Sequence, residues 1–169
     1  MDRIDIVFSR EALFRQSSNS VLAAAAVAGG GDGAADALRM EREDMDVFDM
    51  LADMARSRVD VALSHLMSDE KRVCPKECSC DGGPCACGEL PHGMLISDGA
   101  IRYELTLTHP MQRNMLPAAI ERVLVLSIAE EWLRMRSLPV DLGLARAWER
   151  LRSVSLMCRT PPKRPYSYC

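Results

Sequence analysis

The amino-acid sequence predicts a mainly α-helical protein, a bundle of about four helices with a small two-stranded β element. Hydrophobic residues make up 48% of the 169 residues, but aromatic residues only 5%. Ala, Leu, Val and Met must therefore fill the core, and these residues suit helix packing better than sheet stacking. Apolar residues also recur every three or four positions over long stretches, whereas only two short stretches alternate polar and apolar residues.

The two alternating stretches predict two short strands. Residues Arg3–Phe8 (RIDIVF) and Ile101–Thr108 (IRYELTLT) place apolar side chains at every second position, as half-buried strands do. A short strand is not stable by itself, so we expect these two to pair with each other.

Residues 9–40 begin as a helix and reach a glycine-rich stretch. Ser9 is placed to cap a helix that runs through Glu11 and Phe14, and the alanine run that follows also favours helix. The glycines at positions 29, 30, 31 and 33 stop that helix and make a flexible connection. The same Ala and Gly content is also typical of loose packing or disorder, so the order of residues 17–40 stays open.

The clearest helical pattern covers Glu41–Met67. One apolar stripe runs through Met45, Phe48, Ala52, Ala55, Val59, Ala62 and Leu66, and it is widened by Met50, Met54 and Val61. Acidic residues dominate the first part, where they complement the positive end of the helix dipole. We interpret them as a solvated helix face rather than as catalytic carboxylates. The flexible Met side chains fit two interpretations, as filler of an uneven core or as part of an adaptable interface.

Two further helices are predicted in the last third of the chain. The segment that begins near Asn114 is apolar on nearly every side up to Leu133. Such a helix is central and is covered by neighbouring helices or by other subunits. Pro139 ends the next connection, Asp141 is placed to cap, and the apolar spacing over Leu144–Ser155 predicts the last helix.

The length of the chain fits one domain. We expect a single helical domain over residues 1–158, with a Cys-rich loop inserted at 69–95 and a basic, Pro-rich tail at 159–169. The tail is basic through Arg159, Lys163 and Arg164, and its prolines favour an extended, mobile chain. Three roles fit such a tail: insertion into a neighbouring subunit, contact with DNA phosphates, or a frayed end without a role.

Five closely spaced cysteines are the most unusual local feature: Cys74, Cys78, Cys80, Cys85 and Cys87. Thiolates bind zinc tetrahedrally, and a structural zinc ion would stabilise a segment that has no core of its own. The C-x-C pairs are, however, tighter than the usual zinc knuckle spacing. Two disulfides, or a loop without a defined site, are the other interpretations. In each case we expect the role of the cysteines to be structural.

No catalytic pattern stands out, and we expect a protein that is not an enzyme. His65, His92 and His109 are isolated from one another, and GGGDG lacks the Lys-Ser/Thr of a phosphate-binding loop. A net charge of −3 argues against a general nucleic-acid coat. The N-terminal residues MDRIDIVFSREALF lack the pattern of a secretory signal, and no apolar stretch is long enough to span a bilayer. We therefore expect a protein that is intracellular, or assembled inside a cell, without a membrane partner.

Four stretches together resemble a group of small helical phage and prophage structural proteins, those of the head–tail connector or tail-completion type. They are MDVFDMLADMARSRVDVALSHLMS, IRYELTLTHP, AAIERVLVLSIAEEWLRMRSLP and the final WERLRS with CRTPPKRP. The likeness covers about two thirds of the chain and rests on hydrophobic patterns rather than on fixed chemistry. The Cys-rich loop and the Ala/Gly stretch have no counterpart in it.

The resemblance implies a non-enzymatic virion assembly protein that acts through subunit interfaces, as a homo-oligomer and with portal or tail-tube proteins. It also implies assembly in the host cytoplasm and a place in the virion. We expect the interfaces to use Val123, Leu126, Trp132, Met50, Met54, Arg159, Lys163 and Arg164, with the tail also able to contact DNA. The alternative is a small zinc-binding regulator or adaptor whose Cys-rich loop binds a partner.

Overall fold

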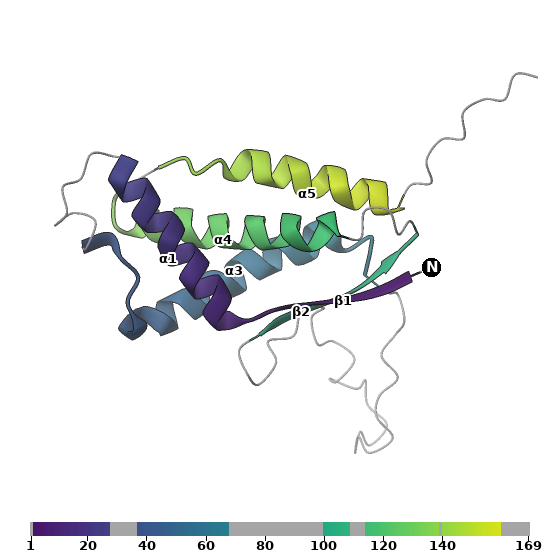
Figure 1. Cartoon of the computed structure of the whole chain (residues 1–169), viewed down its shortest axis with the longest axis horizontal. Helices are drawn as coiled ribbons and strands as arrows, with labels where there is room; N and C mark the ends of the chain where they lie inside the picture. Colours follow the sequence, from purple (N-terminus) through teal and green to yellow (C-terminus); the bar gives the residue numbers. More distant parts are fainter. Residues whose placement is uncertain (1, 28–36, 68–99, 109–113, 139, 160–169) are drawn as a thin grey trace, which may run out of the picture.

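The computed structural model describes residues 2–27, 37–67, 100–108, 114–138 and 140–159, and it confirms the predicted fold class. Its four long helices are α1 (Arg10–Val27), α3 (Met45–Leu63), α4 (Met115–Met135) and α5 (Leu144–Arg159), and its strands are β1 (Asp2–Phe8) and β2 (Ile101–Leu107). Figure 1 shows the helices packed side by side, with the small sheet at one end.

The two strands pair antiparallel, as their alternating patterns predicted. Ile4 lies opposite Leu105, Ile6 opposite Tyr103 and Phe8 opposite Ile101. All six side chains are buried in the core, because residues at every second position face the same side of a sheet.

Helix α1 settles part of the question about residues 17–40. Ser9 caps it as predicted, since its Oγ accepts a hydrogen bond from the Ala12 N–H at 3.2 Å. The alanine run is helical up to Val27, whereas residues 28–36 lie outside the described residues. The buried face of α1 consists mainly of small side chains, so its backbone comes close to α4, where the Ser17 hydroxyl donates to the Val125 carbonyl at 3.5 Å.

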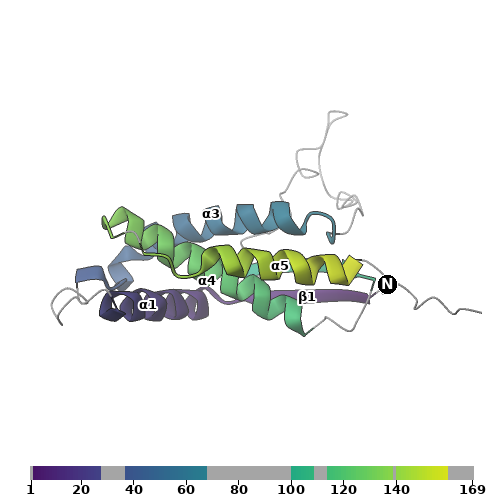
Figure 2. The same ribbon diagram turned by 90° about the horizontal axis from the view of Figure 1, so that it is seen from above.

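Helix α4 is the centre of the bundle. It contacts α1, α3 and α5, and Figure 2 shows α1 and α3 on opposite sides of it. Every residue from Val123 to Ala129 is buried. A helix that is apolar on all sides is stable only when it is covered on all sides, and here its own chain supplies the cover.

The segment predicted as one helix over Glu41–Met67 is shorter and is divided. A 3-10 turn over Arg42–Asp44 precedes α3, and the Glu41 N–H donates to the Asp44 carboxylate at 2.9 Å. After Leu63 the chain leaves the helix, and the Leu66 carbonyl accepts a hydrogen bond from the Thr106 N–H at 2.8 Å. Bonds to the edge of β2 thus replace the last helical turn.

The start of α5 is held from α4. The Glu130 carboxylate accepts hydrogen bonds from the N–H groups of Leu142 at 3.0 Å and Leu144 at 3.3 Å. Asp141, the predicted cap, accepts instead from the Gly143 N–H at 2.7 Å. Gly143 has a φ of +81°, a conformation that glycine adopts without strain.

The described helices and strands share one hydrophobic core. The predicted insertion at 69–95 and residues 160–169 of the predicted tail lie outside the described residues. Among the helices that the structure describes, none is both long and apolar enough to cross a membrane.

Candidate functional site

Helix α3 has an outer side that carries exposed apolar side chains. Its opposite side packs into the core through Phe48, Leu51, Ala52, Ala55, Val59 and Leu63. On the outer side, Met50, Met54 and Val61 are 50%, 41% and 77% exposed. Residues four and seven positions apart lie on the same side of an α-helix, so these three side chains form one apolar stripe.

Carboxylates accompany this stripe on one flank. The Arg10 guanidinium binds both carboxylate oxygens of Asp49, with its Nε 2.6 Å from Oδ1. Arg56 Nη2 lies 3.5 Å from Asp53 Oδ1. Asp46 is exposed and has no ion pair within the described part of the chain. We use the name α3 outer face for Asp46, Met50, Asp53, Met54 and Val61.

Next to the α3 outer face, Asp60 of α3 lies close to Tyr103 of β2. Burial raises the pKa of Asp60 from 3.8 to about 6, against the opposing effects of the Arg56 charge and of the nearby Tyr103 hydroxyl. Burial, and then the Asp60 charge, raise the pKa of the Tyr103 hydroxyl. The two groups interact without a well-formed hydrogen bond, because neither Asp60 Oδ1 nor Tyr103 Oη has a hydrogen-bond partner among the described residues.

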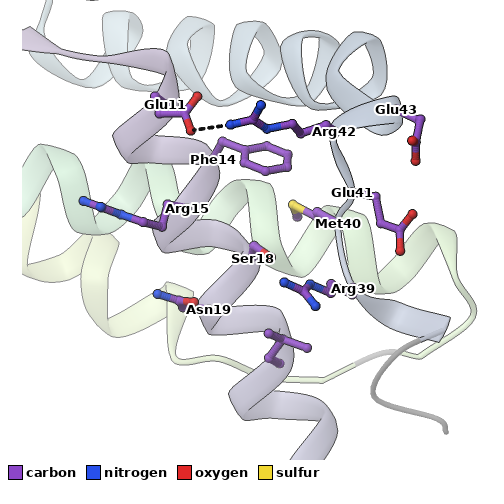
Figure 3. A pocket seen from close by; sticks show the side chains of 11 residues that line it. Glu11, Phe14, Arg15, Ser18, Asn19, Arg39, Met40, Glu41, Arg42 and Glu43 are labelled. Carbon is purple, nitrogen blue, oxygen red and sulfur yellow. Dashed lines mark ion pairs between the residues drawn. The ribbon is translucent and has the colours of Figure 1, made fainter.

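A groove of about 450 Å³ lies between α1 and the segment that leads into α3 (Figure 3). Phe14 and Met40 lie between the two segments, and an ion pair of 3.8 Å joins Arg42 to Glu11 across the groove. Three arginines and three glutamates line it, so their charges balance. Because the Arg42–Glu11 pair is highly exposed, it contributes little to stability. This groove offers no net charge to attract an ionic ligand.

Three residues predicted at an interface belong to the core instead. Val123, Leu126 and Trp132 are only 0%, 3% and 2% exposed, because α1, α3 and α5 cover α4 within the same chain. The Trp132 indole N–H donates to the Leu38 carbonyl at 2.8 Å, and the Arg136 guanidinium lies 4.7 Å from the centre of its ring. In this fold these side chains have almost no surface to offer to a partner.

The other predicted site residues divide into two groups. Met50 and Met54 are exposed, as an interface requires. Lys163, Arg164, the Arg159 side chain and the five cysteines between 74 and 87 lie outside what the structure describes.

The proximity of Asp60 to Tyr103 was not predicted from the sequence. Tyr103 falls on the buried side of an alternating strand, and a buried tyrosine hydroxyl usually requires a polar neighbour. That signal was present, but nothing in the sequence indicates which distant residue lies near the hydroxyl.

Comparisons with protein-family models, with curated proteins and with solved structures find no match for this chain. Within the described residues, no group of three or more His, Cys, Asp or Glu side chains is placed to hold a metal ion. The α3 outer face is therefore the surface on which we base a functional proposal.

Proposed function

We propose that this chain is a non-enzymatic phage virion assembly protein, a head–tail connector or tail-completion subunit that acts through subunit interfaces. The observation that carries the proposal is the exposed apolar stripe of Met50, Met54 and Val61, flanked by carboxylates. Exposed apolar side chains that gather on one helix face are typical of surfaces that become buried on association. Flexible Met side chains suit such a surface, because they adapt to an uneven partner.

The resemblance of the sequence to small phage structural proteins supplies the biological setting of the proposal. In that setting the partners are further copies of the chain and other virion proteins, such as a portal or a tail tube. Assembly takes place in the host cytoplasm, and the product is part of the virion. The competing proposal, a zinc-binding regulator or adaptor, rests on the spacing of the five cysteines between 74 and 87.

Deletion of the gene from the phage or prophage that encodes it tests the proposal. We expect electron micrographs of the lysate to show separate heads and tails, and the wild-type chain to restore joined, infectious particles. A Met50→Ser/Met54→Ser variant should fail to restore them, because it removes apolar area from the α3 outer face.

A matched control is available in Met115→Ser/Met135→Ser, since Met115 and Met135 of α4 are exposed to similar extents, 43% and 54%. This control should restore infectious particles. Joined, infectious particles from the deletion strain would refute the proposal, as would the absence of the protein from purified virions or tails.

A further inference from the structure

We propose that a second copy of this chain is the partner of the α3 outer face, and that this copy binds through an exposed, basic stripe on its α5. The inference rests on the proposed function and deepens it, because it names the surface that completes the interface between subunits. In this contact α3 of one copy lies against α5 of the next, so the two copies contribute different surfaces.

Helix α5 carries an exposed stripe with the same spacing as the apolar stripe of α3. Arg146, Arg150 and Met157 are all exposed, Met157 to 50%. They follow one another at intervals of four and seven residues, as the three apolar residues of the α3 outer face do, so they share one side of their helix. We use the name α5 stripe for Arg146, Arg150 and Met157.

The α3 outer face is acidic. It contains the carboxylates of Asp46 and Asp53, and Asp46 has no ion pair within the described part of the chain. Arg58 is an exposed cation near this face, but its guanidinium lies 4.0 Å from a carboxylate oxygen of Glu131, which offsets its charge. A partner surface with cations and apolar side chains therefore suits the α3 outer face.

The α5 stripe supplies those cations. Among the described residues, neither Arg146 nor Arg150 has an ion pair, so both guanidinium groups can bind the carboxylates of a partner. Glu149 and Arg152 are exposed beside the stripe, and their opposite charges cancel. This side of α5 thus keeps a net positive charge.

The charges also disfavour contacts between identical surfaces. Two α3 outer faces in contact would bring carboxylates together, and two α5 stripes would bring guanidinium groups together. Like charges at an interface cost free energy, and this suppresses the wrong pairing. The pairing of α3 with α5 is the one in which opposite charges meet.

The order of charged and apolar groups along the two helices matches as well. From Asp53 to Val61 α3 rises by about 12 Å, and from Arg150 to Met157 α5 rises by about 10 Å, at 1.5 Å per residue. When the two helices lie parallel, Asp53 can therefore face Arg150 while Val61 faces Met157. The contact then combines an ion pair with burial of exposed apolar side chains from both copies.

One copy presents both surfaces at once. Helices α3 and α5 each pack against α4, and Figure 1 shows them on different sides of it. A copy that is bound through its α3 outer face therefore still presents its α5 stripe to a further copy. Contacts between unlike surfaces add subunits one after another, so association is not limited to two copies.

Two complementary variants of the purified full chain test the contact. Met50→Ser/Met54→Ser/Val61→Ser removes the apolar stripe of the α3 outer face, and Arg146→Glu/Arg150→Glu reverses the charge of the α5 stripe. Sedimentation velocity should show wild type forming oligomers larger than dimers. For each variant alone, we expect the dissociation constant of self-association to rise about tenfold or more.

An equimolar mixture of the two variants should form a heterodimer and nothing larger, because one intact surface of each kind remains. This heterodimer also shows that both variants are folded. The proposal is overturned if wild type stays monomeric at every concentration tested, or if the mixture contains no heterodimer although circular dichroism shows both variants folded. Self-association of the α5 variant at the strength of wild type would contradict it too, since the α3 outer face would then bind another surface.

Charge exchange within one chain tests the contact independently. Adding Asp46→Lys/Asp53→Lys to Arg146→Glu/Arg150→Glu should restore self-association, because opposite charges face each other again. Salt should weaken the association of both the wild-type and the exchanged chain, since the paired charges lie at the surface. A folded exchanged chain that stays monomeric would contradict the proposal.

Arg15→Glu/Arg122→Glu is the matched control, because both arginines are exposed and have no ion pair among the described residues. It reverses the same number of charges away from the two surfaces and should associate as wild type does. If Arg146→Glu/Arg150→Glu instead abolishes binding of duplex DNA and leaves self-association unchanged, the α5 stripe serves nucleic acid and the proposal is overturned.

The mixing experiment and the virion experiment can fail separately. A virion protein whose α3 outer face contacts only other virion proteins would fail to form the heterodimer and would still be required for joined particles. Self-association of the purified chain, in turn, does not depend on phage particles.

Discussion

Asp60 is a half-buried carboxylic acid beside a buried tyrosine hydroxyl, and this position makes it sensitive to pH. Its pKa rises to about 6 because burial disfavours the charged form more than Arg56 and Tyr103 favour it. A carboxyl group whose folded pKa exceeds its unfolded value binds its proton more tightly in the folded state. Its contribution to stability is therefore complete below the unfolded pKa and is lost as the pH rises through about 6.

Asp60→Asn should remove this loss of stability at higher pH, because the amide stays neutral at every pH. We expect the difference in the free energy of unfolding, variant minus wild type, to rise by about 1 kcal/mol from about pH 4 to pH 7.5. This value is reduced for solvent screening, because the group is partly exposed. Urea unfolding at the two pH values measures the difference. Glu149→Gln, at an exposed position of α5, serves as the control. A difference between Asp60→Asn and wild type that is independent of pH would contradict the assignment.

At the scale of elements, α4 determines how the other helices are arranged, and Trp132 connects it to the chain that leads into α3. The indole N–H binds the Leu38 carbonyl, and the ring is covered by Arg136. This tryptophan fastens residues 37–44 to the central helix, so its role is to hold elements of one chain together.

Trp132→Phe should lower the free energy of unfolding by about 1–2 kcal/mol, because it leaves the Leu38 carbonyl without its donor and reduces the buried apolar area. The loss should be the same at different protein concentrations, as measured by chemical denaturation. Trp148→Phe is a suitable control, since Trp148 is only partly buried and has no indole hydrogen bond in the described part of the chain. A Trp132→Phe variant of unchanged stability but weaker self-association would instead support the predicted interface role.

At the scale of the whole molecule, the sequence was informative wherever structure depends on local periodicity. The alternation in RIDIVF and IRYELTLT predicted both strands and their pairing. The segment around Val123 is apolar on nearly every side, and this predicted a central helix. The sequence did not distinguish whether neighbouring helices or other subunits cover that helix. Helix α1 covers α4 mainly with small Ser and Ala side chains, and these residues give only a weak hydrophobic pattern in the sequence.

Long-range contacts account for the remaining differences between the elements predicted from the sequence and those of the structure. The predicted helix over Glu41–Met67 ends early because Leu66 finds a hydrogen-bond donor in Thr106 of β2, on the far side of the predicted insertion. Glu130 caps α5 from another helix, and Asp60 lies near Tyr103, which is 43 residues further along the chain. Periodicity carries no information about such pairs, so the candidate site was predicted only through Met50 and Met54.

The competing proposal of a zinc-binding adaptor is also a question about the whole molecule, because its metal would bind outside the described fold. It predicts about one zinc ion per chain after purification under reducing conditions, as measured by elemental analysis. Cys78→Ser/Cys85→Ser should release the metal and leave the helical circular dichroism unchanged, whereas Cys158→Ala should retain it. Reduced wild-type protein without metal would refute this proposal.

The hydrogen bonds that the carbonyls of Leu66 and Cys158 accept from Thr106 and Thr108 also bear on solubility. The exposed edge of a small sheet readily adds a strand from another molecule, and this is a common route to aggregation. Here the chain occupies two donors at that edge with its own backbone. This arrangement disfavours strand-to-strand addition at this edge wherever the chain is present at high concentration. Under the proposed function, association is then left to the side chains of the helices, where the amino-acid sequence determines the choice of partner.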